Sequence, residues 1–179
     1  LPILYVTHSL DEMMTLATDV IILENTKNNA SIKSIGPLID VLQDVNHEFN
    51  GSDKAGSIIR GQLLPEHKDG LYEVALTEHV LYVAKPSHLE SGPIRLHIQA
   101  RDVSLCLSPA TDSSILNILP ARILEIKHSN QASCLVKLKM DNQVLLSRIS
   151  KHSVARLNLK TGMQVYAQIK AIVLQQTQV

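Results

Sequence analysis

The first side chain in this sequence with the chemistry to act on a phosphate is His8. It follows the short apolar run Ile3–Val6, and the acidic residues Asp11 and Glu12 come shortly after it. An imidazole at the end of a strand can donate a hydrogen bond to a terminal phosphate oxygen, and it titrates near neutral pH. The alternative for any isolated histidine is a structural, partly buried side chain.

The residues around this histidine predict the elements that would position it. Ile3–Val6 has the composition of a fully buried parallel strand, and Val20–Leu23 predicts a second one. Ser9 and Glu12 have the spacing of a capping box, which predicts a helix start. Asp11 and Glu12 would point about 100° apart on that helix, so they cannot converge on one substrate.

A change of pattern predicts where this first part ends. Ser31–Ile35 is expected to pair back on the second strand, and Gly36-Pro37 to open a helix that runs to Leu42. Residues 50–61 contain three glycines and little apolar pattern, which marks a boundary. Short strands separated by turn residues follow and predict a barrel or sandwich, with an OB-like unit at the end. The expected strands are Ile58–Leu64, Leu71–Leu76, His79–Val83, Ile94–Ile98, Val103–Leu107, Ala121–Ile126, Ser133–Lys139, Gln143–Ile149 and Gln164–Ile172.

Composition argues against several classes of function. Seventeen basic residues balance seventeen acidic ones, so the basic excess typical of nucleic-acid binding is missing. Cys106 and Cys134 have no CxxC spacing, and none of the eight histidines has the spacing of a helical metal site. We therefore expect reduced thiols, no metal site and no nucleic-acid partner. No apolar run approaches the roughly 20 residues that span a bilayer.

The run LPILYVTHSLDE, followed by ATDVIILENT and a Gly-Pro helix start, resembles the switch-histidine region of ABC-transporter ATPases across residues 1–45. The resemblance implies that His8 is the catalytic switch histidine of a longer protein that uses ATP and Mg²⁺. The chain contains no match to the Gly-rich loop and lysine that hold phosphates in these enzymes. We therefore expect His8 to be idle here, and the chain neither to bind ATP tightly nor to hydrolyse it.

Four motifs near the end resemble the molybdate-binding Mop unit, a type of TOBE domain. They are SSILN at 113–117, SRIS at 147–150, LNLKTG at 157–162 and YAQIKA at 166–171. The resemblance implies an oxyanion site between two copies of the domain, with Ser114, Asn117, Lys170 and Ala171 as ligands; such donors and a cation suit a tetrahedral dianion. The family usually has Arg where Leu116 stands, and the lost guanidinium puts binding in doubt. The alternative is that Ser114 and Asn117 cap a turn while Lys170 extends from a strand.

Together the two resemblances imply a mixed fold, an α/β remnant of an ABC ATPase domain followed by an all-β OB-like region. The expected divisions are 1–49, a linker and β-rich regulatory arm at 50–112, and a Mop/TOBE domain at 113–179. The implied function is the regulatory and dimerising carboxyl-terminal part of the ATP-hydrolysing subunit of a bacterial molybdate importer. Sensing of intracellular molybdate or tungstate is part of that expectation.

The implied partners are a second copy, membrane permease subunits and a periplasmic molybdate-binding protein, which places the protein at the cytoplasmic face of the inner membrane. Two alternatives stay open: the tail of an ABC ATPase for another solute, such as sulfate or a sugar, with a purely structural TOBE domain, and a free molybdate-binding storage or regulatory protein. We also expect Ile3–Val6 and Val20–Leu23 to be exposed apolar strands, and the Gln-rich end 175–179 to be frayed.

Overall fold

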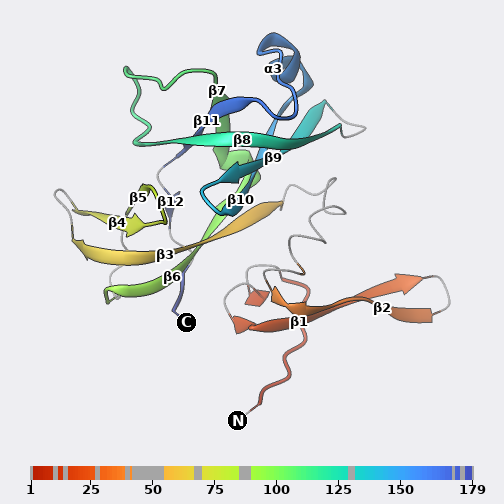
Figure 1. The fold of residues 1–179 in the computed structure, drawn as a ribbon. Coiled ribbons are helices and arrows are strands. Elements are labelled where there is room, and N and C mark those ends of the chain that lie inside the picture. The colour runs from red at the N-terminus through yellow and green to blue at the C-terminus, as the bar shows by residue number, and fades with distance from the viewer. Residues whose placement is uncertain are drawn as a thin grey trace.

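The computed structural model is mostly β-strand, and its described residues form three sheets (Figure 1). The structure describes residues 2–9, 12–13, 16–26, 29–38, 41, 55–66, 70–84, 90–128, 132–170, 172–173 and 176–178. In chain order the elements are β1 (Asp19–Thr26), β2 (Asn29–Pro37), β3 (Gly56–Glu66), β4 (Leu71–Ala75), β5 (Val80–Ala84), β6 (Gly92–Gln99), the 3-10 helix η3 (Ala100–Asp102), β7 (Val103–Cys106), β8 (Asn117–His128), β9 (Ser133–Met140), β10 (Gln143–Ser150), α3 (Lys151–Arg156), β11 (Gln164–Ile169), β12 (Ile172–Val173) and β13 (Gln176–Gln178).

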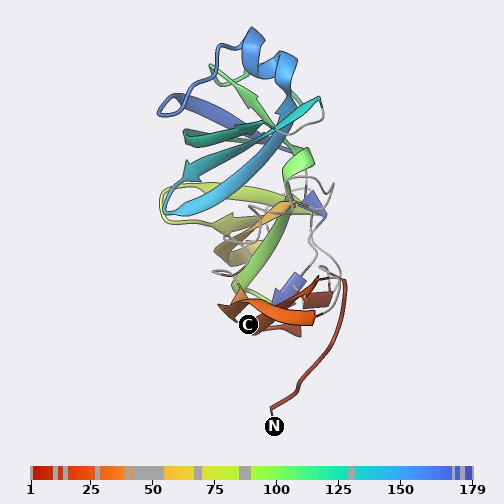
Figure 2. The same cartoon turned by 90° about the vertical axis from the view of Figure 1, so that its right-hand side faces the viewer.

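The three sheets follow one another along the long direction of the molecule (Figure 2). A five-stranded sheet, in the order β10-β9-β8-β11-β7, lies with α3 at one end. A six-stranded sheet, in the order β12-β5-β4-β3-β6-β13, lies in the middle, and the β1–β2 hairpin lies at the other end. The all-β region expected from the short strands is confirmed, and the helical content expected for the first part is minor among the described residues.

The two larger sheets repeat the same four-stranded unit. In the first unit the strand order is β5-β4-β3-β6, and in the second it is β10-β9-β8-β11, with antiparallel pairing throughout. The ladders superpose residue by residue: the pair Ile59–Leu96 corresponds to Leu119–Ala167. Both long first strands have a register shift at the same place, after Leu63 and after Ile123. The sequence did not reveal this repeat, because the two copies share apolar alternation rather than residue identity.

Each unit is completed by the segment that follows the other unit. β7 comes after the first unit and pairs with β11 of the second, and it also lies beside β10. β12 and β13 come after the second unit, and they pair with β5 and β6 at the two edges of the first. Because β12 and β13 are nearly consecutive in the chain, the six-stranded sheet must curl until its edges approach each other.

This exchange bears on two expectations. The expected division between 50–112 and 113–179 stays a prediction, but strand pairing crosses it in both directions. The frayed end expected for 175–179 is wrong for Gln176–Gln178, which form β13 against β6. The backbone groups of these polar residues find partners in the open edge of the first unit, and that satisfies them regardless of side-chain character.

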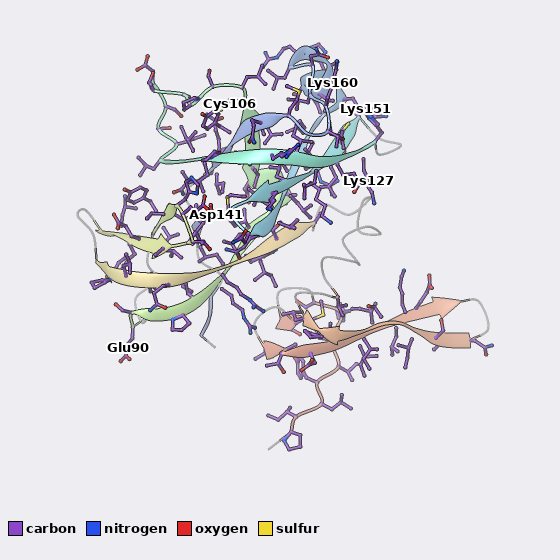
Figure 3. All side chains as sticks on the ribbon, viewed as in Figure 1. Glu90, Cys106, Lys127, Asp141, Lys151 and Lys160 are labelled. Carbon is purple, nitrogen blue, oxygen red and sulfur yellow. The ribbon has the colours of Figure 1, made fainter. Side chains whose placement is uncertain are left out.

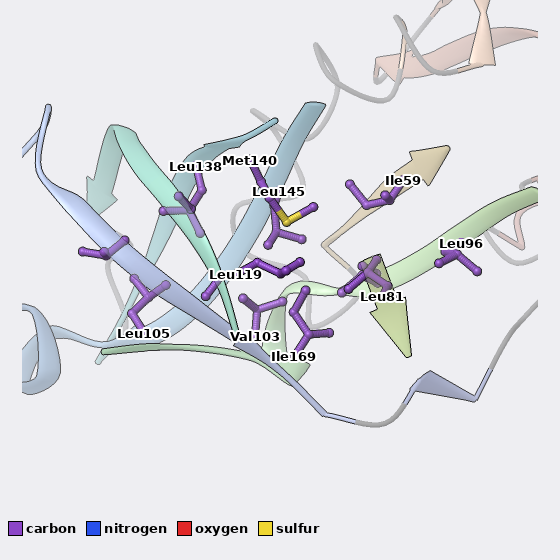
Figure 4. Close-up of a cluster of buried hydrophobic side chains, with 14 of the residues drawn as sticks. Ile59, Leu81, Leu96, Val103, Leu105, Leu119, Leu138, Met140, Leu145 and Ile169 are labelled. Carbon is purple, nitrogen blue, oxygen red and sulfur yellow. The ribbon is translucent and has the colours of Figure 1, made fainter. Parts of the chain in front are cut away.

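One core of aliphatic side chains joins both units (Figure 4). It draws on inward-facing positions of each strand from β3 to β11, and full burial of each such side chain contributes about 1.5–3 kcal/mol. Its members include Ile59, Leu81, Leu96, Val103, Leu105, Leu119, Leu138, Met140, Leu145 and Ile169. Since the core is continuous, the two units pack against each other and do not form separate domains.

The first part of the chain departs from expectation at its start. Ile3–Val6 forms no strand, and its four side chains are 56–88% exposed. A strand needs a neighbour for its backbone hydrogen bonds, and no described strand pairs with this one. Val20–Leu23 lies in β1 and pairs with β2, as expected, and the exposure of Ile21 and Leu23 also agrees with the expected exposed apolar strand.

A small second core lies beneath this hairpin. Val20, Leu38 and Val41 are buried, and Ile58 of β3 packs against them. Leu38 and Val41 are helical, in agreement with the helix expected after Gly36-Pro37; the rest of that helix, to Leu42, lies outside the described residues.

Two of the glycines that predicted a boundary, Gly56 and Gly61, instead lie inside β3. A Cβ at Gly61 would stand 2.3 Å from Val74 Cγ1 and 2.8 Å from the Ala75 carbonyl oxygen. Glycine is therefore required there by the close approach of β4, and not by a turn.

Candidate oxyanion site

His8, the predicted switch histidine, is exposed on an extended segment. Ser9 accepts a hydrogen bond from the Glu12 backbone N–H through its hydroxyl, which is half of the predicted capping box. The Glu12 carboxylate turns instead to the Thr7 and Tyr5 hydroxyls, and these two hydrogen bonds lower the pKa of Glu12. Among the described residues, the hydrogen bonds made by residues 5–12 stay within residues 5–13, so the structure gives His8 a surface position and no phosphate cradle.

Two of the predicted oxyanion ligands, Asn117 and Lys170, lie along the backbone at one end of the five-stranded sheet. Asn117 opens β8 and pairs with Ile169, the last residue of β11, so Lys170 follows directly beside it. Ser114 lies three residues before Asn117 in the segment that enters β8, and both Ser114 and Lys170 are exposed. Ala171 lies outside the described residues. The backbone N–H of Lys170 donates to the Asp102 carbonyl (3.4 Å), which fixes the exit of β11.

Asn117 is not at the surface with them. Its side chain is buried, at 2% exposure. Its Oδ1 accepts from the Tyr82 backbone N–H at 2.7 Å, and its Nδ2 donates to the Tyr82 carbonyl at 2.9 Å. Asn117 therefore binds β5 of the first unit to β8 of the second, and its amide mimics a strand neighbour for Tyr82.

A matching contact lies at the equivalent place in the other unit. Ser57 of β3 corresponds to Asn117 by register, and Leu146 of β10 corresponds to Tyr82. The Leu146 backbone N–H donates to the buried Ser57 hydroxyl at 2.8 Å. The two contacts exchange when the units are exchanged, as in an isologous interface.

Ser147 of the SRIS motif also has a structural partner. Its buried hydroxyl donates to the Val103 carbonyl at 2.7 Å, which attaches β7 to β10. Together with Asn117, it indicates that part of the Mop-like pattern specifies how the units join. Ser114 and Lys170, by contrast, are exposed.

The turn between β4 and β5 of the first unit meets the turn between β9 and β10 of the second (Figure 3). Asp141, in the turn between β9 and β10, accepts from the Glu78 backbone N–H at 3.2 Å, and its Oδ1 lies 2.5 Å from His79 Nδ1. Asp141 has φ 50°, a left-handed conformation that aspartate tolerates. Among the described residues, Glu78, His79 and Asp141 have potential metal-ligand atoms that lie within 4.8 Å of one another. No sequence pattern indicated this group, because the two turns lie far apart in the chain.

Both cysteines are free thiols among the described residues, as expected. Burial raises the pKa of Cys106 and of Cys134. Neither therefore has the thiolate character of a nucleophile or of a ready metal ligand. Cys134 lies 3.3 Å from His128 Nδ1 across the β8–β9 pair.

Comparison with known proteins finds relatives along nearly the whole chain. A family model described as the TOBE domain matches residues 113–172. The molybdenum import ATP-binding protein ModC 2 of Azotobacter vinelandii is 40% identical over 178 residues, which cover 97% of this chain and 48% of that protein. The ModC protein of Pseudomonas aeruginosa is 38% identical (96% and 48% covered), and that of Salmonella typhimurium is 34% identical (96% and 48%).

The homologues of this chain are molybdenum import ATP-binding proteins. The resemblance stated from the two sets of motifs is thereby confirmed. The matches run through nearly the whole chain, so the ABC-like start and the Mop-like end belong to one kind of protein. The chain spans about half the length of the curated relatives it matches.

A solved structure shares the fold. The cytoplasmic molybdate-binding protein ModG, crystallised with molybdate bound, superposes with a TM-score of 0.54 at 22% identity, over 65% of this chain and 91% of that one. This share is larger than residues 113–172 supply, so the likeness reaches beyond the TOBE segment into the first unit. No described helix is long and apolar enough to cross a membrane.

Proposed function

We propose that this chain is the regulatory and dimerising carboxyl-terminal part of the ATP-hydrolysing subunit of a molybdate importer, and that it senses intracellular oxyanion. The observation that supports the proposal is that nearly the whole of this chain matches molybdenum import ATP-binding proteins. In this proposal the importer hydrolyses ATP with Mg²⁺, works with membrane permease subunits and a periplasmic binding protein, and lies at the cytoplasmic face of the inner membrane.

His8 belongs to the ATP-hydrolysing activity of the longer protein in this proposal. The 179 residues contain no Gly-rich phosphate loop, and His8 is exposed. The residues present therefore do not fit a complete ATP site, and we expect the chain alone to be inactive as an ATPase.

The oxyanion site that we propose is built from Ser114, Lys170 and Ala171 at the open end of β8 and β11. Ser114 and Lys170 are both exposed and flank the paired ends of β8 and β11, which supports this site. Asn117 is proposed as a positioning residue, because its amide already binds Tyr82. A second copy of the chain would supply the remaining donors, since one hydroxyl and one ammonium alone are few for a dianion.

A specific observation favours a second candidate, an importer subunit for another solute whose TOBE domain is purely structural. Leu116, 58% exposed, stands where the family usually has an arginine. An apolar side chain at this edge suits contact between two copies and supplies no donor to an oxyanion.

Calorimetric titration of the chain with molybdate, tungstate and sulfate separates the two candidates. Sensing predicts a component of the molybdate heat that Lys170→Ala removes, whereas Lys160→Ala, which removes an exposed lysine elsewhere in the same unit, leaves that component unchanged. Sedimentation with and without molybdate measures the dimer. No heat at millimolar molybdate would exclude sensing and leave the structural candidate.

A further inference from the structure

A pair of arginines lies on the first unit, away from the Mop-like motifs. Arg60 of β3 and Arg95 of β6 are direct cross-strand partners, and both side chains lie on the outer face of the six-stranded sheet. Their inward neighbours Ile59 and Leu96 are fully buried, which fixes the arginines on the opposite face.

The backbone brings these two arginines as close as an antiparallel sheet allows. The Arg60 N–H donates to Gln143 Oε1 at 2.7 Å, and the Arg60 carbonyl accepts from Gln143 Nε2 at 2.9 Å. Since both backbone groups are turned away from β6, Arg60 and Arg95 form a non-hydrogen-bonded pair, in which side chains stand nearest. Like charges directly opposite each other destabilise a sheet.

The structure offers little to offset this repulsion. Among the described residues, the ion pairs and side-chain hydrogen bonds do not include either guanidinium. The strands β6 and β13 contain no acidic residue, the acid of β3 is six residues further along, at Glu66, and the other neighbour of β3, β4, carries Glu73. The two arginines are thus direct cross-strand neighbours, and neither β6 nor β13 supplies a carboxylate to them.

The repeat shows that the fold itself does not require them. By register, Arg60 corresponds to Pro120 and Arg95 to Tyr166, which form the equivalent cross-strand pair in the second unit. The degree of exposure is the same at each position: Pro120 and Arg60 are exposed, and Tyr166 and Arg95 are partly buried. Uncharged residues therefore serve the same architecture, and the arginine pair needs another explanation.

We propose that Arg60 and Arg95 form a clamp for a free tetrahedral oxyanion dianion, such as sulfate, phosphate or molybdate. Two guanidinium groups supply paired N–H donors and two positive charges, and each can bind two oxygens of one anion side by side. A bound dianion turns the repulsion between the arginines into attraction to a shared ligand. The clamp is separate from the Ser114–Lys170 site and does not depend on the proposed function.

Its location connects it to the first part of the chain. Ile58, two residues before Arg60 on the same face of β3, packs against Val20, Leu38 and Val41 beneath the β1–β2 hairpin. An anion on the clamp therefore lies beside the contact between the six-stranded sheet and the hairpin.

Calorimetry with sulfate and with molybdate on the full chain tests the clamp. The double variant Arg60→Gln/Arg95→Gln should lose roughly tenfold or more in affinity, because charged hydrogen bonds are lost. Arg156→Gln, which removes an exposed arginine of α3, should change affinity less than twofold. Arg60→Lys/Arg95→Lys should recover part of the binding, and added NaCl should weaken it in the wild type.

Stability in anion-free buffer gives a second readout. Removing two like charges should leave the thermal midpoint unchanged or raised in the Gln double variant. A fall would mean that the arginines have partners within the chain and would overturn the proposal, as would wild-type affinity in the double variant or no heat with either anion. Lys170→Ala keeps the two sites distinct, because it should remove the proposed Mop-like site and spare the clamp.

Discussion

Asn117→Ala tests how the two units are held together. The substitution removes the acceptor for the Tyr82 N–H and one donor to the Tyr82 carbonyl, in a place that is 2% exposed. A buried group that loses its partner costs about 1–3 kcal/mol, and a typical hydrogen bond contributes about 1 kcal/mol net. We therefore expect the free energy of unfolding to fall by about 2–4 kcal/mol.

The pseudo-equivalent residue provides a graded comparison. Ser57→Ala removes one hydrogen bond, from the Leu146 N–H, and should cost about 1–2 kcal/mol. Asn117→Asp keeps the acceptor for the Tyr82 N–H but sets an oxygen against the Tyr82 carbonyl, so it should not rescue the loss. Gln164→Ala, at an exposed position of β11, serves as the matched control.

Urea unfolding followed by circular dichroism gives the free energies, and hydrogen exchange locates the effect. The Tyr82 amide should exchange faster in Asn117→Ala, and the Leu146 amide in Ser57→Ala. An Asn117→Ala variant within about 0.5 kcal/mol of the Gln164→Ala control, the usual range for surface changes, would refute the reasoning. So would an unchanged exchange rate at Tyr82.

Two further predictions concern the first unit. Gly61→Val should lower the thermal midpoint because its Cβ would meet Val74 Cγ1 at 2.3 Å, and overpacking costs about 1–3 kcal/mol. Gly70→Ala is the control without a clash, because nothing lies within 4 Å of a Cβ there, and any cost at Gly70 comes from its left-handed φ. Deleting residues 172–179 should speed amide exchange in β5 and β6 more than in β8 and β9, because β12 and β13 cover the edges of the first unit. Equal effects on both units would contradict the strand exchange.

The candidate site was predictable only in part. Short motifs named Ser114 and Lys170, and strand pairing puts the two segments at the paired ends of β8 and β11; their role as ligands stays a prediction. Asn117 had the same standing in the sequence, yet it is buried and bound to Tyr82. Its partner lies 35 residues earlier and is a backbone group, so no side-chain motif could have named it.

Sequence patterns could not predict the contacts between the units either, because the partners lie far apart in the chain. Asp141 meets His79 across 62 residues, and Gln143 meets the Arg60 backbone across 83. The clamp depends on register: Arg60 and Arg95 become neighbours only when β3 and β6 pair with no shift between them. A slip of one residue would put them on opposite faces.

The sequence by itself determined the strands and the family. Alternating apolar residues predict each large strand within a few positions, because side chains on successive strand residues face opposite ways. The motifs around His8 and Lys170 indicated an importer subunit, and the relatives agree. Tertiary structure decided that the strands form two like units, that β7 and β13 each complete the other unit, and that Ile3–Val6 is not a strand. These outcomes depend on which backbone groups find partners far along the chain, and that is settled only when the whole core packs.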